Sequence, residues 1–510
     1  MTEQHQNGSE VHVATSQPTA SGKGVPTETN PWSEKVEVEA LPRWQRWLWK
    51  AATWGRVEIR GISPIPVEER TVKRTINIFT LWFGMSANIL AITFGMIGPA
   101  SGLSLRDSSL VILFFILLTT LLPAYLATLG PKTGMRQMIQ ARYSWGRWLV
   151  SIPVFLNLAT MIGFAAIISV VGGQCLSAVA DGGITPTIGI VIITIIALII
   201  SFCGFKVLHY YERYAVIPAV IAIIVAVGCG GKGLTNQVPP AGPSSAPKVL
   251  SFAMIVASYM IPWACLASDF TTYLDPKTSS WRIAAYTYAG LSIPTILLMV
   301  LGAAIGGAVA GNPDWEAAYA STLTGGVLDA MLRPAGGFGK FLLVILSLSL
   351  LGNVAATSYS ITLNFQMLLP KLSSVPRYLW AIAMTAIVIP VSIRASVDFY
   401  SNLSNVMSLI GYWSSAFLAT LIVEHLWFRR GDCSTYDPED WSNAKRLPLG
   451  VAALVSAALS FAVVIPSMAQ VWYTGPIAEK TGDIGFELAF FVTAALYFPF
   501  RTLEKKLVGR

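Results

Sequence analysis

Apolar residues run in about twelve stretches between Ile76 and Phe500, and each is long enough to cross a bilayer. A hydrocarbon core of ~30 Å needs about 20 apolar residues of helix. One or two such stretches could be an anchor, whereas about twelve must form the working part of the molecule. We expect spans near residues 76–100, 108–129, 148–178, 185–203, 212–230, 250–272, 284–310, 338–366, 377–394, 403–427, 448–468 and 484–502. The pattern therefore predicts an all-α membrane protein that moves a substrate across the bilayer.

Composition supports a polytopic membrane protein. Hydrophobic residues make up 54% of the chain and charged residues only 12%, against roughly 25% charged in a soluble domain. The net charge of +8 could suggest a nucleic-acid partner, but the Lys and Arg residues are spread over short loops. A nucleic-acid site needs them clustered on one face. The five cysteines lack metal-ligand spacing, so we expect no metal site, and we expect no cofactor. The apolar composition makes the lipid bilayer an expected partner.

Three regions follow from polarity. Residues 1–75 are expected to form a disordered cytosolic tail, residues 76–502 the transporter domain, and residues 503–510 a short cytosolic tail. From Pro42 to Trp54 the first tail alternates tryptophans with basic residues. That end suits an amphipathic helix in the headgroup region, with packing on the transmembrane body as the alternative.

Orientation follows from the loops between the spans. If the N-terminus is inside, the inner loops and the C-terminus hold 18 Lys and Arg residues and the outer loops hold 7. Basic residues accumulate on the cytosolic side. Both termini are therefore predicted to be cytosolic.

Motifs for catalysis are missing from the sequence. No HExxH, GxSxG or Walker A pattern occurs, and one GxGxxG match, Gly228 to Gly233, closes an apolar span. A dinucleotide site needs a strand before that motif and a helix after it. A channel is also disfavoured, because the chain has neither a filter-like repeat nor a ring of charges. We expect a transporter and not an enzyme.

Polar residues near the middle of four spans mark a candidate binding site, because such residues usually face a cavity or another helix. Ser86 and Asn88 lie between two glycines in the first span, and Pro262 interrupts the sixth beside Ser258, Tyr259 and Trp263. The third span contributes Asn157, Ser169 and Gln174 together with Phe164, and the eighth contributes Asn353 and Thr357. Interrupted helices at matching places of two halves are typical of inverted-repeat secondary transporters. The alternative is that these small and hydroxylated residues only join helices.

Charge inside the spans is scarce. Asp269 is the carboxylate nearest to a transport pathway, 19 residues after Leu250, or ~28 Å along a straight helix. It is therefore expected near the cytosolic end, where it could be a protonated gate or a structural partner of a loop Lys or Arg. Glu424 and His425 close the tenth span on the same side and allow the same two interpretations.

Six segments in order give the chain a family resemblance. They are LWFGMSANI, GPKTGMRQMIQARYSWGR, VVGGQCL, YYERYAVIPAV, PWACLASDFTTYL and GYWSSAFLATLIVEHLWFRRG. With them the chain resembles the fungal purine–cytosine permeases, a branch of the nucleobase–cation symporter family. The resemblance implies a five-plus-five inverted repeat with two extra helices. It also implies uptake of a small heterocyclic substrate together with protons across the plasma membrane.

Family binding positions fall on Ser86, Trp263 and Asn353 by this resemblance. The chain departs from the pattern GWxxxN in the third span, where Phe164 replaces the Trp and Ile168 the Asn. In the eighth span it departs from NNxPNxYS, where Thr357 replaces the third Asn.

Fewer amides imply a ligand with fewer or different polar edges, since an unmatched buried polar group costs about 1–3 kcal/mol. We expect a nucleobase such as cytosine or a purine, with a vitamin B6 compound (pyridoxine-like) or another small heterocycle as the alternative. Sodium-coupled relatives look to have a Ser-Thr pair shortly before the eighth-span Asn, and this chain has Ser347-Leu348 at that place. Hard cations need several oxygens, so the lost hydroxyl favours protons.

Overall fold

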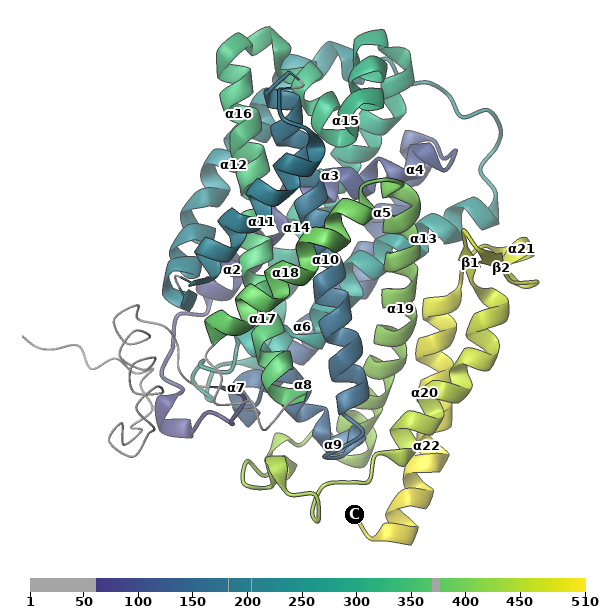
Figure 1. The fold of residues 1–510 in the computed structure, drawn as a ribbon. Coiled ribbons are helices and arrows are strands. Elements are labelled where there is room, and N and C mark those ends of the chain that lie inside the picture. The colour runs from purple at the N-terminus through teal and green to yellow at the C-terminus, as the bar shows by residue number, and fades with distance from the viewer. Residues whose placement is uncertain (1–60, 182, 203, 369–376) are drawn as a thin grey trace, which may run out of the picture.

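The computed structural model describes residues 61–181, 183–202, 204–368 and 377–510, and nearly all of them belong to a bundle of helices (Figure 1). The first half contains α2 (Ile76–Ser86), α3 (Ile89–Gly95), α4 (Ile97–Ala100), α5 (Leu105–Thr119), α6 (Leu121–Ala127), α7 (Leu129–Thr133), α8 (Gln137–Gln140), α9 (Arg142–Trp145), α10 (Ser151–Val179), α11 (Pro186–Phe202) and α12 (Gly204–Leu234). The second half contains α13 (Ala246–Met260), η3 (Ile261–Cys265), η4 (Ala267–Phe270), α14 (Ser280–Ala308), α15 (Pro313–Leu332), α16 (Gly336–Ser349), α17 (Leu351–Leu368), α18 (Arg377–Ala395) and α19 (Phe399–Val423). The C-terminal part contains η8 (Glu424–Phe428), α20 (Val451–Val464), the two-stranded hairpin of β1 (Ala469–Gln470) and β2 (Tyr473–Thr474), α21 (Ala478–Thr481) and α22 (Gly485–Val508).

Membrane-spanning helices occupy the places that hydropathy predicted. Among the described residues, eight helices are long and apolar enough to cross a bilayer, and a bent pair makes a ninth. Three shorter apolar helices, Pro186–Ile200, Leu379–Ala395 and Val451–Ser467, stand at the predicted fourth, ninth and eleventh spans. The prediction of an all-α membrane protein with about twelve spans is confirmed.

Both predicted interruptions exist. The first span is two helices, Ile76–Ser86 and Ile89–Ala100, bent by 57°. In the sixth span the α-helix ends at Met260 and continues as short 3₁₀ turns through Pro262. Proline cannot donate the intrahelical hydrogen bond and clashes with the preceding turn, which explains the second break. The two breaks lie at equivalent places of the two halves, as an inverted repeat requires.

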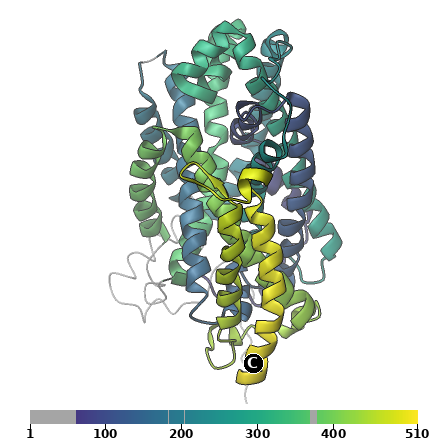
Figure 2. The same cartoon turned by 90° about the vertical axis from the view of Figure 1, so that its right-hand side faces the viewer.

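The two extra helices form a separate pair. α20 and α22 pack against each other, and both contact α19, the last helix of the repeats. The pair, drawn in yellow and yellow-green, lies on the side of the bundle that faces the viewer in Figure 2. The C-terminus marks one end of the bundle, which we call the C-terminal side, and α15 lies at the opposite end (Figure 1).

Three parts of the predicted organisation differ in the structure. The stretch 311–337, expected as a loop, holds the helix α15, in which Thr322 and Leu323 break the helical geometry. α22 continues to Val508 and so includes most of the predicted tail 503–510. Residues 61–75, placed in the N-terminal tail, lie against the body, where Ile65 is buried and Arg70 donates to the carbonyls of residues 131–133. The prediction for residues 1–60 lies outside the described residues.

Close helix packing brings α3 against α14. A Cβ at Gly95 would lie 1.9 Å from the Met299 carbonyl oxygen, and a Cβ at Gly302 would lie 2.0 Å from the Ile92 carbonyl oxygen. Small residues allow such approaches in membrane helices. The pair of glycines therefore fixes the second half of the broken span on α14.

Substituting Gly302→Ala is expected to prevent accumulation of folded protein, because backbone atoms on two helices would have to separate. Overpacking in a well-packed site costs typically 1–3 kcal/mol or more. The matched control is Gly228→Ala, since a Cβ there meets nothing within 4 Å. Fluorescence size-exclusion chromatography of both variants measures the effect. A sharp monodisperse peak for Gly302→Ala at the wild-type height would show that this helix contact is dispensable.

Candidate functional site

The break in the first span is built around Asn88. Its side chain is fully buried, its Oδ1 accepts from the Leu90 backbone N–H at 2.9 Å, and its Nδ2 donates to the Met85 carbonyl at 2.7 Å. Asn88 thus caps the start of α3, a position where asparagine is strongly preferred. Both ends of the amide hold the break together. Ser86, also buried, is the last residue of α2, and its carbonyl accepts from the Asn88 N–H at 3.0 Å.

Asn353 of α17 joins the same break. Its Nδ2 donates to the Met85 carbonyl at 3.2 Å, so one unwound carbonyl accepts from two spans. Thr357, one turn later, donates to the Asn353 carbonyl at 2.8 Å, and its Oγ1 lies 3.3 Å from Asn353 Oδ1. The structure therefore brings four candidates together, Ser86, Asn88, Asn353 and Thr357, around one helix break.

Trp263 lies in the 3₁₀ turn of the other break and is only 7% exposed. Its ring meets that of Trp82 edge to face, with centroids 5.6 Å apart, and Trp82 meets Phe270 in the same way at 5.3 Å. Edge-to-face pairs are favourable beyond the area they bury. Because Trp82 belongs to α2, the aromatic group bridges the two broken spans.

Phe164 and Ile168 lie one turn apart on α10, and both are buried. The Phe164 ring faces Tyr259 at 6.5 Å, and Tyr259 faces Phe94 of α3 at 4.8 Å. α10 also contacts α17 and η3. The candidates from the third span therefore lie beside both broken helices, and the candidates from four spans converge on one region.

Tyr259 is the residue that sequence reasoning left out of the binding set. It was noted as a neighbour of Pro262, but its place between Phe94 and Phe164 depends on three spans that are far apart in sequence. Its hydroxyl is buried and has no hydrogen-bond partner among the described residues. The one signal available in the sequence was a polar aromatic residue in the last turn before the helix break.

Asp269 lies apart from this region, in η4 at the end of the sixth span. Its Oδ1 accepts from the Gln137 N–H at 2.8 Å, and Arg136 Nη1 donates to its backbone carbonyl at 3.3 Å. Gln137 Oε1 in turn accepts from the Ser268 N–H at 3.3 Å. The carboxylate thus fastens the sixth span to the segment between the second and third spans. This contact suits both a gate and a structural link.

Glu424 is held by three neighbouring side chains. Arg501 Nε lies 3.0 Å from Glu424 Oε2, Tyr497 donates to the same oxygen at 2.9 Å, and Arg429 Nε lies 3.3 Å from Oε1. Ion pairs buried this deeply are costly to break. Glu424 therefore links α19 to α22, and of the two interpretations open for it the structure favours a structural partner.

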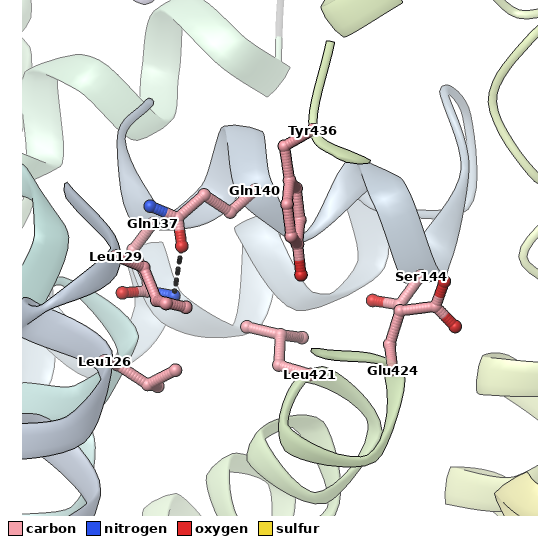
Figure 3. A pocket seen from close by; sticks show the side chains of 8 residues that line it. All are labelled: Leu126, Leu129, Gln137, Gln140, Ser144, Leu421, Glu424 and Tyr436. Carbon is pink, nitrogen blue, oxygen red and sulfur yellow. Dashed lines mark hydrogen bonds between the residues drawn. The ribbon is translucent and has the colours of Figure 1, made fainter. Parts of the chain in front are cut away.

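A small hollow lies next to this network on the C-terminal side (Figure 3). Its empty volume is about 240 Å³, which includes open solvent, and Figure 3 shows the lining side chains Leu126, Leu129, Gln137, Gln140, Ser144, Leu421, Glu424 and Tyr436. Gln137 belongs both to this hollow and to the contact with Asp269. The hollow therefore lies near the predicted gate and away from the polar midpoints of the spans.

The loop after α19 covers this end of the bundle. Arg142 donates to the Trp441 carbonyl at 2.9 Å and lies 5.0 Å from the centre of its ring, while the Tyr143 hydroxyl donates to the Asp437 carbonyl. Burial lowers the pKa of Arg142 to about 9, so the guanidinium stays charged at neutral pH. Burial raises the pKa of Tyr143, which keeps its hydroxyl a donor. The loop between α19 and α20 therefore packs over the segment between the second and third spans.

Two broken helices that meet at a buried polar region define an integral membrane transporter. The family model described as a permease for cytosine/purines, uracil, thiamine and allantoin matches residues 64–488. The chain belongs to this family, and membership in a family of permeases confirms the prediction that it is not an enzyme.

Curated relatives cover nearly the whole chain. The purine-cytosine permease fcyB of Emericella nidulans is 34% identical over 89% of this chain and 90% of its own. The purine-cytosine permease FCY2 of Saccharomyces cerevisiae is 31% identical over 91% and 89%. The vitamin B6 transporter TPN1 of the same yeast is 27% identical over 96% and 95%. The resemblance to the fungal purine–cytosine permeases is thus confirmed.

Solved structures support the fold. Mhp1, a nucleobase-cation-symport-1 family transporter in a closed conformation with bromovinylhydantoin bound, matches with a TM-score of 0.68. It is 16% identical, and the match covers 88% of this chain and 96% of that chain. Inward-facing Mhp1 matches with a TM-score of 0.66 at 15% identity, over 87% of this chain and 93% of that chain. The fold of this family is shared, as the inverted-repeat prediction required.

Proposed function

We propose that this permease is a proton symporter that imports a nucleobase, cytosine or a purine, across the plasma membrane, with both termini in the cytosol. The observation that carries the proposal is the convergence of Trp263, Phe164 and Asn353 on two helix breaks, in a chain of the cytosine and purine permease family. Flat aromatic faces and an amide suit a planar heterocycle, because the faces stack and the amide bonds to an edge.

The substrate would lie between the two breaks. Trp263 and Phe164 contribute ring faces, Asn353 and Thr357 contribute edge hydrogen bonds, and Ile168 contributes an apolar wall. Ser86 and Asn88 form the wall on the side of the first span. Because the Asn88 amide already caps α3, we assign it the role of stabilising the break and assign direct bonding to its neighbours.

The contacts of Ser347 support proton coupling. Its hydroxyl donates to the Gly172 carbonyl of α10 at 3.0 Å, so it is held against the third span. The next residue, Leu348, has no side-chain oxygen. A sodium site needs several oxygens at one point, and this pair offers few. Asp269 is the carboxylate we assign to gating and coupling, since it joins the sixth span to Gln137.

Vitamin B6 uptake is the second candidate. It rests on the likeness to the vitamin B6 transporter TPN1 and on the apolar Ile168 at a position where the permease pattern has an amide. A pyridine ring with hydroxyl groups needs a different set of partners from a base with several amide-like edges. The two candidates differ in substrate and share the fold and the coupling.

Uptake by a fungal host that lacks its own permeases separates these candidates. Cells that express the chain are expected to take up labelled cytosine or a purine faster than empty-vector cells, and faster still as the external pH falls. A protonophore should abolish uptake, and replacing sodium by choline should leave it unchanged. Uptake of pyridoxine without any nucleobase would favour the second candidate, and dependence on sodium would contradict proton coupling.

A further inference from the structure

Tyr259 combines burial, a polar group and an aromatic position at the candidate site. The side chain is 2% exposed, and its hydroxyl has no hydrogen-bond partner among the described residues. Buried polar groups nearly always have a partner, and one without a partner calls for an explanation. A ligand that forms a hydrogen bond with this hydroxyl is one such explanation.

The position of Tyr259 indicates that this ligand is the transported substrate. The Tyr259 ring lies between Phe94 of α3, at 4.8 Å, and Phe164 of α10, at 6.5 Å. Trp263 follows four residues later at the helix break. The Tyr259 ring therefore joins the first, third and sixth spans, the same spans that hold the aromatic candidates.

Two other buried polar atoms near the breaks are weaker candidates. Ser258 Oγ also has no partner among the described residues, but a Cβ at Gly411 would lie 2.2 Å from it, so it points toward α19. Trp82 Nε1 likewise has no hydrogen-bond partner in the described part of the chain, and its ring packs edge to face against Trp263 and Phe270. Tyr259 alone of the three has its ring against that of Phe164.

We propose that the Tyr259 hydroxyl is a specificity-determining group that hydrogen-bonds an exocyclic amino or hydroxyl group on the edge of the heterocyclic substrate. This inference rests on the proposed function. A phenol both donates and accepts, so it replaces part of the hydrogen bonding that amides at positions 168 and 357 would give. It selects for substrates that present a polar group at that edge, because an analogue without one leaves the phenol unpaired.

The test is inhibition of uptake by matched pairs of heterocycles in wild type and Tyr259→Phe. The pairs are adenine and purine, cytosine and pyrimidin-2-one, and pyridoxine and its 4-deoxy analogue. Tyr259→Phe is expected to weaken binding of the substituted member of one pair about tenfold. Its unsubstituted partner should change less than about twofold. The variant should therefore lose the preference within that pair, a result that a merely structural tyrosine would not produce.

The control is Tyr288→Phe, which also removes a phenol hydroxyl, one that already donates to the Leu117 carbonyl at 3.0 Å. It should leave every preference unchanged. Equal affinities for wild type and Tyr259→Phe in all pairs, or parallel losses for both members, would overturn the inference and leave the proposed function standing. If the wild type takes up none of these heterocycles, the proposed function fails and the inference fails with it. Should Tyr259→Phe not reach the membrane, Tyr259→His, which keeps a donor, is expected to retain a preference that Tyr259→Leu loses.

Discussion

Replacing Trp263 by alanine is expected to reduce uptake at low substrate concentration at least about tenfold. The ring is buried in the 3₁₀ turn at the sixth-span break and is held edge-on by Trp82. Loss of an aromatic pair removes about 0.5–1.5 kcal/mol beyond area burial, and the lost apolar contact with the substrate adds to this. A change of 1.4 kcal/mol is tenfold in affinity.

Trp263→Phe should retain part of the uptake, because a phenyl ring still offers a stacking face. Trp281→Ala is the matched control, since Trp281 is 77% exposed at the start of α14. Concentration-dependent uptake, normalised to protein at the cell surface, measures all three variants. Normal transport by Trp263→Ala at wild-type surface levels would remove Trp263 from the binding site.

Replacing Asp269 by asparagine is expected to abolish concentrative uptake while exchange of labelled for unlabelled substrate continues. Asparagine keeps an oxygen that can accept from the Gln137 N–H, as Asp269 Oδ1 does at 2.8 Å, but it cannot carry a proton. The accumulation ratio should fall to about one. A driving force of one pH unit corresponds to roughly 1.4 kcal/mol, a tenfold gradient.

Asp314→Asn serves as the control, because Asp314 is exposed in the first turn of α15. Accumulation and exchange are measured on the same cells at two external pH values. If Asp269→Asn still concentrates substrate with the wild-type pH dependence, Asp269 is a structural link to the Arg136 segment. The coupling proton would then bind elsewhere.

Much of this architecture was predictable because a bilayer imposes a simple rule on sequence. Apolar stretches gave the spans, and Pro262 indicated the sixth-span break, because proline disrupts a helix wherever it stands. The break at Asn88 was suggested by the polar residues between Gly84 and Gly95. Its mechanism, a side-chain cap on α3, appears only in the hydrogen bonds.

Other features depend on contacts that hydropathy does not report. α15 is too polar to register as a span, although Asn312, Pro313 and two acidic residues form a helix start. For Glu424 the sequence left a gate and a structural partner both open, because two of its three partners, Tyr497 and Arg501, are more than 70 positions away. Tyr259 was not predicted as a binding residue for a similar reason, because its neighbours Phe94 and Phe164 lie far away in sequence, on α3 and α10.

The most direct test of the central claim is transport by the purified protein in liposomes under an imposed pH gradient, acid outside and without sodium. Labelled cytosine or a purine is expected to accumulate inside above the external concentration and to leave again when the gradient is collapsed. Accumulation that requires sodium, or accumulation of pyridoxine alone, would contradict the account of a proton-coupled nucleobase symporter.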